Sequence, residues 1–226
     1  MNNENQNKVL EGLVSHWPLT REYCSVVEGE LVLHDVVGGY DGRAVYADVC
    51  NGWTLFNGKN SHVIVGNYKI FDFGKSPFSI SCWFNANEVG SGILVMKGSM
   101  GRKGRRYDLH ALSQGHMRFC IDDNGWRGKQ RVDSHSHYNV GEWYHLTGVR
   151  GAEGISFYVN GKSVESSSST SRKCGDIDGL KRPLVFGIDS TSLEKLPFSG
   201  KMRSVRIYNR VLTSDDIEHI YKSELQ

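Results

Sequence analysis

The sequence has 226 residues, of which 38% are hydrophobic and 23% charged, and 27 basic against 25 acidic residues give a formal net charge of +2. This composition is typical of one large or two small globular domains and excludes an intrinsically disordered chain. No apolar run approaches the roughly 20 residues of a membrane helix, and a balanced charge exerts no global attraction on nucleic acid. We therefore expect neither membrane insertion nor a nucleic-acid partner.

The amino-terminal segment is polar, and its first twelve residues, MNNENQNKVLEG, contain no apolar core of a secretion signal. We expect residues 1–11 to form a flexible tail that precedes a single domain over residues 12–226. The five cysteines form no CxxC pair, which argues against a zinc ribbon; they are Cys24, Cys50, Cys82, Cys120 and Cys174. We predict that most of them are free thiols, which favours folding inside a cell over folding in an oxidising compartment.

Short predicted strands fill most of the chain, separated by Gly, Asn, Asp and Ser; the clearest lie at residues 78–84, 117–122, 155–159 and 202–208. The pair Asn160-Gly161 predicts a two-residue β-hairpin turn. Helical periodicity is convincing only near the carboxyl end, where Thr213 is a good N-cap and Asp216 stands three residues later. Because helices and strands do not alternate, the pattern predicts an all-β sandwich or jelly roll with a short C-terminal helix.

Several short blocks occur in a specific order. They are GLVSHWPL (12–19), LFNGKNSHV (55–63), FSISCWF (78–84), MKG (96–98), GEWYHL (141–146), YVNG (158–161), FSG (198–200) and VRIYNR (205–210). Together, over about residues 12–223, they resemble the laminin G-like, concanavalin A-like jelly-roll domain family. The resemblance implies two packed antiparallel sheets, with the strand near residues 13–19 beside the strand near residues 202–208.

The resemblance also implies a function, although a fold alone does not prove one. Most such domains are similar to lectins or carbohydrate-binding modules, so the expected partner is a glycan or polysaccharide and the expected role is non-catalytic recognition. The main alternative is a structural or adhesion protein, such as a virion or cell-surface component. The family resemblance implies an extracellular or surface location, whereas the missing signal and the predicted free thiols fit a chain that folds inside a cell.

A structural calcium ion is the cofactor that the resemblance raises. Family members often carry paired aspartates just before the strand that reads VRIY, where the aspartates help to hold calcium. This sequence has Met202, Arg203 and Ser204 at those positions. Asp35 and Asp41 remain as weak candidate ligands, but calcium prefers six to eight oxygens. We therefore expect no cofactor, with calcium as the alternative left open.

Strand alternation predicts which side chains form a binding surface. In the strand at residues 78–84, alternation places Phe78 in the core and Trp83 on the opposite face. If the strands around residues 107–111, 117–122 and 155–159 join it in one concave sheet, that surface carries Trp83, His110, His116, Arg118, Asp122, His145 and Tyr158. Sugars have apolar faces and hydroxyl rims, so an aromatic ring among hydrogen-bonding groups suits them. The alternative is an ordinary solvated polar face.

A basic run at residues 97–106, KGSMGRKGRR, contains five cations and three glycines and is predicted to be a loop. A second cationic loop follows at residues 125–131. Arginine forks bind carboxylate or sulfate groups in a bidentate manner. The candidate ligands of an anionic polysaccharide here are Arg105, Arg106, Trp126 and Arg127. The alternative is a solubilising loop whose charges are screened by salt.

The sequence offers weak support for catalysis. It has no ExDxxE carboxylate string, and adjacent residues such as Asp122 and Asp123 point to opposite sides of a strand, so no glycosidase pair is indicated. A polysaccharide lyase remains as an alternative, because Arg118 with His110, His145 or Tyr158 would supply a neutralising cation and a base. The spacing His135-Ser136-His137 would suit a metal, but without a third ligand it predicts a surface loop.

Overall fold

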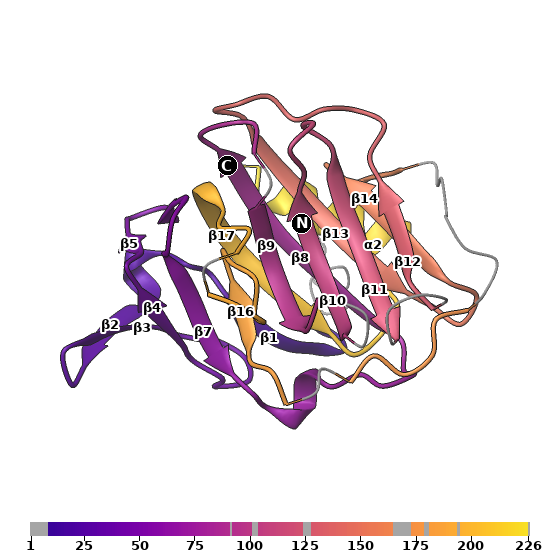
Figure 1. Ribbon diagram of the computed structural model, residues 1–226, viewed down its shortest axis with the longest axis horizontal. Helices are drawn as coiled ribbons and strands as arrows, with labels where there is room; N and C mark the ends of the chain where they lie inside the picture. The colour runs from indigo at the N-terminus through magenta and orange to yellow at the C-terminus, as the bar shows by residue number, and fades with distance from the viewer. Residues whose placement is uncertain are drawn as a thin grey trace.

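The computed structural model describes residues 9–90, 92–100, 104–123, 128–164, 173–178, 181–193 and 195–225. Two antiparallel sheets pack face to face, which confirms the predicted all-β sandwich (Figure 1). In the nine-stranded sheet the order is β12–β11–β10–β9–β16–β7–β4–β3–β2. Its bounds are β2 Cys24–Val27, β3 Glu30–Leu33, β4 Gly42–Val45, β7 His62–Gly66, β9 Gly92–Gly98, β10 Arg105–Ala111, β11 Met117–Asp123, β12 Gln130–Asp133 and β16 Leu184–Phe186.

The eight-stranded sheet has the order β15–β14–β13–β8–β17–β6–β5, and β1 also pairs with β17. Its bounds are β1 Leu13–Trp17, β5 Asp48–Val49, β6 Thr54–Asn57, β8 Phe78–Ala86, β13 Trp143–Arg150, β14 Ile155–Val159, β15 Lys162–Ser163 and β17 Ser199–Tyr208. The register places Trp17 opposite Val205, so the predicted pairing of the terminal strands is confirmed. Two short 3-10 helices, η1 (Arg21–Tyr23) and η2 (Lys69–Phe71), complete the connections.

The core lies between the sheets and follows the predicted alternation. Phe78, Ile80, Cys82 and Phe84 on β8 are all fully buried in it. On β13 the glycine at position 148 is required by packing, because a Cβ there would stand 2.3 Å from the Phe119 ring of the facing sheet. The sequence pattern therefore specifies the inward face of these strands correctly.

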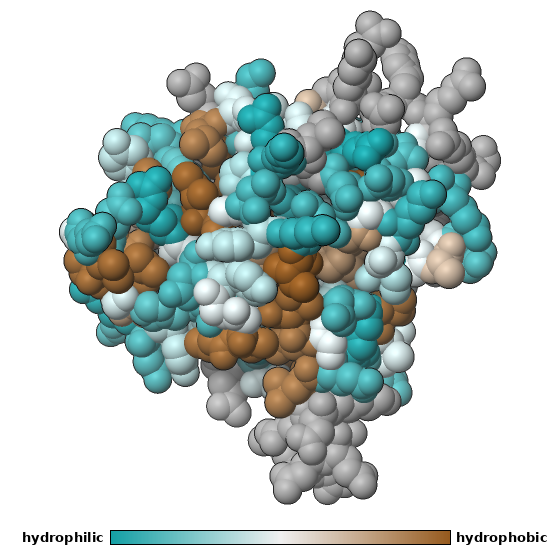
Figure 2. Space-filling view, turned by 90° about the horizontal axis from the view of Figure 1, so that it is seen from below, coloured by the Kyte–Doolittle hydropathy of each residue, from teal (hydrophilic) through white to brown (hydrophobic). Residues whose placement is uncertain are grey.

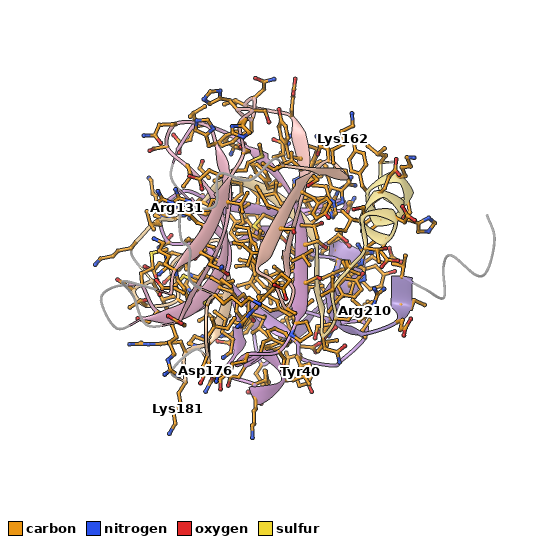
Figure 3. All side chains as sticks on the ribbon, turned by 90° about the vertical axis from the view of Figure 1, so that its right-hand side faces the viewer. Tyr40, Arg131, Lys162, Asp176, Lys181 and Arg210 are labelled. Carbon is orange, nitrogen blue, oxygen red and sulfur yellow. The ribbon has the colours of Figure 1, made fainter. Side chains whose placement is uncertain are left out.

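Local turn and helix signals are also confirmed. Asn160 and Gly161 have φ values of 51° and 77°, the left-handed conformation that a two-residue hairpin turn needs, and they join β14 to β15. Helix α2 (Ser214–Ser223) begins at Thr213, which forms the predicted reciprocal capping box with Asp216. α2 covers the outer face of the eight-stranded sheet and lies on the side of the sandwich opposite Arg131 (Figure 3).

The chain preceding β1 contacts this helix-covered face. Val9 packs against the cluster formed by Tyr208, Leu212 and Ile217, and the Glu11 carbonyl accepts a hydrogen bond from Arg210. The first eight residues of the predicted tail lie outside the described residues. All five cysteines are free thiols, as predicted. In the part of the chain that the structure describes, no helix has the length and apolarity to cross a bilayer.

The surface seen from below is mainly hydrophilic and carries several brown hydrophobic patches (Figure 2). Among the exposed apolar residues of the molecule are Val26 and Val27 on β2, at the edge of the nine-stranded sheet. Partial exposure of apolar side chains is normal for a folded protein. The exposed valines therefore do not mark a functional site by themselves.

Candidate functional site

The predicted binding surface is divided between two sheets, so the expectation of one shared concave face is wrong. Trp83, His145 and Tyr158 belong to β8, β13 and β14 of the eight-stranded sheet. His110 on β10 and Arg118 on β11 belong to the nine-stranded sheet, as does Asp122. The outer faces of two packed sheets point away from each other, and alternation specifies only inward or outward, never the sheet that a strand joins.

Trp83 and His145 are buried under α2 rather than exposed. The Trp83 side chain is 1% exposed, its ring stacks on Tyr221 at 5.5 Å, and its Nε1 donates a hydrogen bond to Glu224 Oε2 at 2.7 Å. His145 is fully buried, and neither ring nitrogen has a hydrogen-bond partner among the described residues. Burial lowers the pKa of His145 to about 4. These residues support the helix and do not form a sugar platform.

On the outer face of the nine-stranded sheet, charged side chains neutralise one another. Arg106 is 6% exposed and bonds to Asp108 at 2.7 Å and to Asp122 at 3.2 Å. Arg118 holds Asp133 through two hydrogen bonds, of 2.6 and 2.7 Å. Of the three predicted lyase bases, only His110 lies beside Arg118, opposite it on the neighbouring strand, whereas His145 and Tyr158 lie on the other sheet. The Arg118 guanidinium already has Asp133 as its carboxylate partner.

The remaining predicted residues on the two sheets are also engaged in the structure. Burial lowers the pKa of His110 to about 4. His116 precedes β11, where its Nδ1 lies 2.7 Å from the Ser134 carbonyl oxygen and its ring lies 4.2 Å from the ring of His137. Tyr158 places its hydroxyl 3.2 Å from Ser214 Oγ at the start of α2. The predicted ligand-binding residues therefore do not form one surface. Those of the eight-stranded sheet lie under or beside α2, those of β10 and β11 lie on the outer face of the nine-stranded sheet, and His116 lies beside His137.

The loop prediction for the basic run is wrong at its two ends, which belong to strands β9 and β10. Lys97 ends β9 with its side chain fully buried, and its Nζ lies 3.1 Å from Asp72. Arg105 and Arg106 begin β10, and Arg105 pairs with Asp176 at 3.0 Å. Three of the five cations therefore serve ion pairs, because strand formation draws both ends of the run into the sheet. Residues 101–103 and 124–127, which include Trp126 and Arg127, lie outside the described residues.

The two candidate calcium ligands instead organise the first long loop. The Asp35 carboxylate accepts hydrogen bonds from the backbone N–H groups of His16, Val37 and Tyr40. Asp41 accepts one from the Asp35 backbone and also contacts His34. Within the described ranges, no three His, Cys, Asp or Glu side chains converge in a group able to hold a metal ion. The loop geometry gives both carboxylates a structural role.

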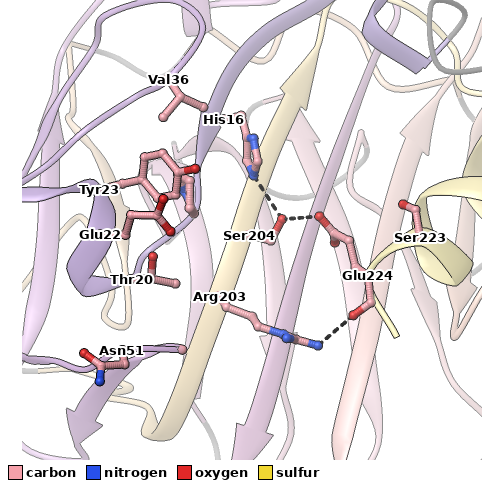
Figure 4. A pocket seen from close by; sticks show the side chains of 12 residues that line it. His16, Thr20, Glu22, Tyr23, Val36, Asn51, Arg203, Ser204, Ser223 and Glu224 are labelled. Atoms are coloured by element: carbon pink, nitrogen blue, oxygen red, sulfur yellow. Dashed lines mark hydrogen bonds between the residues drawn. The ribbon is translucent and has the colours of Figure 1, made fainter. Parts of the chain in front are cut away.

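A cavity of about 510 Å³ lies where β1 and β17 meet the end of α2, and we call it the Tyr23 pocket (Figure 4). Its lining residues are His16, Pro18, Thr20, Glu22, Tyr23, Val36, Asn51, Gly52, Arg203, Ser204, Ser223 and Glu224. Tyr23 and Glu22 are exposed on one wall, on the 3-10 turn η1. Tyr23, which is 37% exposed, gives this wall an apolar ring that solvent reaches.

A β-bulge builds the floor of the pocket. Met202, Val205 and Ile207 all face the core, so β17 contains one extra residue, and its register with β8 shifts between Arg203 and Arg206. Ser204 occupies this bulge at φ 52°, and its backbone N–H bonds to the Pro18 carbonyl at 3.0 Å. The bulge therefore turns both Arg203 and Ser204 toward the pocket.

The hydrogen bonds of Ser204 determine where its single proton lies. Its hydroxyl donates to Glu224 Oε1 at 2.7 Å and accepts from Arg206 Nη1 at 2.9 Å. The third neighbour, His16 Nε2, is 3.1 Å away and must then be the donor. Burial, assisted by Arg206, lowers the pKa of His16 to about 3, so the ring is neutral near pH 7. Ser204 and His16 are thus not arranged as nucleophile and base.

Glu224 is the anion at the centre of the floor. It forms an ion pair with Arg206 and accepts hydrogen bonds from Trp83 and Ser204. Burial opposes ionisation, yet Arg206 and Ser204 hold the pKa of Glu224 below its ordinary value. Arg203 lies over the rings of Trp83 and Trp143 at 4.9 and 5.0 Å and donates to the Glu224 carbonyl. The floor is therefore a rigid set of donors and acceptors.

Sequence reasoning did not identify the Tyr23 pocket. Glu224 follows the helix and is 208 residues away from His16, and no local pattern connects them. One signal was available in the sequence. Arg203 and Ser204 stand at positions where members of the resembled family often have aspartates. That departure identified the correct strand but was interpreted only as evidence against calcium.

Comparison with known proteins supports the fold. A family model described as the concanavalin A-like lectin/glucanases superfamily matches residues 57–218. Comparison with curated protein sequences gives no significant match. Similar solved structures include Trypanosoma rangeli sialidase in complex with sialic acid, with a TM-score of 0.70 and 18% identity over 95% of this chain and 33% of the sialidase.

A second similar structure is the binding domain of botulinum neurotoxin serotype D, with a TM-score of 0.68 and 16% identity over 97% of this chain and 53% of that domain. The chain thus spans about a third of the sialidase and about half of the neurotoxin domain. At these identities the solved structures establish the shared fold alone. From the family match and the two-sheet architecture together, the chain belongs to the concanavalin A-like lectin/glucanase superfamily.

Proposed function

We propose that this domain binds carbohydrate without cleaving it and that the Tyr23 pocket is the binding site. The observation that carries the proposal is the exposed Tyr23 ring above a floor of fixed hydrogen-bonding groups (Figure 4). A sugar presents an apolar face to an aromatic ring and hydroxyl groups to donors and acceptors. The cavity, about 510 Å³, also has the size of a small-molecule site.

The floor can recognise hydroxyl groups because its own partners hold it in place. Arg203, Ser204 and Glu224 form one connected network, so their side chains do not have to be ordered when a ligand arrives. Preorganisation of this kind lowers the entropic cost of binding. Glu22, on the same wall as Tyr23, and Asn51 are exposed and supply further polar groups.

The same network supports recognition rather than hydrolysis. Glycoside hydrolysis needs one protonated carboxylic acid beside a second carboxylate. The lowered pKa of Glu224 keeps it ionised at neutral pH, and Arg206 and Trp83 already hold its oxygens. One similar structure is described as a neurotoxin binding domain, which is consistent with a recognition role on this fold.

A glycan array followed by calorimetry on the glycans that bind tests the proposal. We expect Tyr23→Ala to weaken binding by about 1–3 kcal/mol, the range typical of an aromatic anchor. Tyr46→Ala is the matched control, because Tyr46 is 73% exposed and does not line the pocket. The unmodified protein should release no sugar product.

Equal affinities for the two tyrosine variants would remove the Tyr23 pocket from the proposal. A folded protein that binds no glycan on the array would overturn carbohydrate recognition and favour a structural or adhesion role. Release of reducing ends or of unsaturated uronate product would overturn the non-catalytic assignment.

A further inference from the structure

A second cavity, of about 680 Å³, lies beside the C-terminal part of α2, and we call it the Tyr144 pocket. The residues that line it are His135, Ser136, His137, Tyr144, Val159, Asn160, Lys162, Ser163, Val164 and Tyr221. It shares none of them with the Tyr23 pocket, although Tyr221 in the last turn of α2 lines one cavity and Ser223 and Glu224 line the other. The two pockets are therefore distinct sites on either side of the helix end.

Among the described residues that line the Tyr144 pocket are one lysine and two histidines and no Asp or Glu. Lys162 is an exposed cation on β15, and His137 adds an imidazole whose ring lies against His116 at 4.2 Å. In contrast, Glu22 and Glu224 both line the Tyr23 pocket. A cation with uncharged hydrogen-bonding neighbours, and without a competing carboxylate among the described lining residues, favours an anionic ligand.

Two described carboxylates that are close in sequence to lining residues are engaged by other groups. Glu218 on α2 pairs with Lys222 at 2.6 Å, and Lys162 also contributes to lowering the pKa of Glu218. Glu142 accepts hydrogen bonds from the Tyr144 hydroxyl at 3.0 Å and from Asn139 at 3.1 Å. Neither carboxylate forms an ion pair with Lys162 in the described structure, so the ammonium group remains available to a ligand.

Two aromatic rings give the pocket a rigid apolar component. The Tyr221 ring stacks on Trp83 at 5.5 Å, and the Tyr144 ring lies 5.7 Å from the ring of Phe84. Asn160 is held by the hairpin turn, where its Oδ1 accepts a hydrogen bond from the His145 backbone at 2.8 Å. Apolar rings, an amide, hydroxyls and one cation together match a sugar that carries an acidic group.

We propose that the Tyr144 pocket binds an acidic sugar, with Lys162 and His137 facing its carboxylate or sulfate group. The inference extends the proposed carbohydrate recognition to a second site and to a charged class of sugar. It does not depend on occupation of the Tyr23 pocket, because no residue lines both cavities.

Calorimetric titration of the full chain with glucuronate, glucose 6-sulfate, glucose and inorganic sulfate tests this proposal at low salt. We expect the two acidic sugars to bind at least tenfold more tightly than glucose and than inorganic sulfate. Lys162→Gln should weaken the acidic sugars at least tenfold. Lys59→Gln is the matched control, because Lys59 is an equally exposed lysine outside the pocket, and it should have no effect.

The outcomes also separate this proposal from the function proposed for the Tyr23 pocket. Tyr23→Ala should leave affinity for the acidic sugars unchanged, and Lys162→Gln should leave ligands of the Tyr23 pocket unchanged. Equal affinity for glucuronate and glucose, or equal loss in both lysine variants, would overturn the acidic-sugar site alone. Inorganic sulfate binding as tightly as glucose 6-sulfate would show a simple anion site and would also overturn it.

Discussion

Arg106 is held between two carboxylates on the outer face of the nine-stranded sheet. Its side chain is 7% exposed, and those of Asp108 and Asp122 are 1% and 3% exposed. Removing one partner of a buried charge network leaves the remaining charges unpaired in a poorly solvated environment. Loss of the Arg106 guanidinium would therefore leave two buried carboxylates without their cation.

We expect Arg106→Ala to lower the free energy of unfolding by about 3–5 kcal/mol. Arg105→Ala is the neighbouring control, and it should cost about 1 kcal/mol or less, because its pair with Asp176 is 33% and 40% exposed. Urea denaturation of both variants measures the difference. Equal losses of unfolding free energy in the two variants would show that burial does not determine the contribution of Arg106 to stability.

At the scale of an element, α2 connects the stability of the fold to both pockets. Thr213 Oγ1 accepts from the Asp216 backbone N–H, while Asp216 accepts from the Thr213 N–H and from Arg210. At the opposite end of the helix, Tyr221 lines the Tyr144 pocket and Glu224 lines the Tyr23 pocket. Loosening the first turn of α2 should therefore also affect the two pockets, where ligands are expected to bind.

We expect Thr213→Ala to destabilise the protein by about 1 kcal/mol, the usual cost of losing an N-cap. Asp215→Ala is the control, since Asp215 lies in the same first turn without a capping bond and should cost less. Thermal unfolding of both variants, followed by circular dichroism, measures the two losses of stability. A larger loss in the Asp215 variant would contradict the importance of the capping box.

At the scale of the whole molecule, three buried histidines make the fold sensitive to acid. The pKa values of His16, His110 and His145 are about 3, about 4 and about 4, and burial is the largest cause in each case. The unfolded chain takes up these protons near pH 6.5, whereas the folded chain takes them up only near pH 3–4. Stability is therefore highest above pH 6.5 and falls as the pH decreases toward 4.

His145→Phe should reduce this pH dependence. Lowering the pKa of His145 from 6.5 to about 4 corresponds to about 3 kcal/mol between high and low pH. Phenylalanine does not titrate and removes two buried nitrogens that have no described partner. Urea denaturation at pH 8 and pH 5 should show a smaller difference for the variant than for the unmodified protein. An unchanged difference would mean that His145 does not control acid stability.

The sequence by itself determined what depends on neighbouring residues. Alternation placed Phe78 and Ile80 inward, the pair Asn160-Gly161 specified a hairpin turn, and Thr213 with Asp216 specified the start of α2. The ordered blocks identified the superfamily. Alternation, the hairpin turn and the helix cap each depend on a few neighbouring residues. The family resemblance depends on short segments in chain order, so these predictions need no knowledge of which strands pair.

Only the tertiary structure decided which surfaces these elements form. Alternation is the same in either sheet, so it could not separate Trp83 from His110, nor show that α2 covers Trp83 and His145. The acids that neutralise Arg106 are close because β10 and β11 pair, and Glu224 reaches Ser204 only because α2 folds back on β17. Both candidate pockets depend on such contacts between distant segments, which chain order does not encode locally.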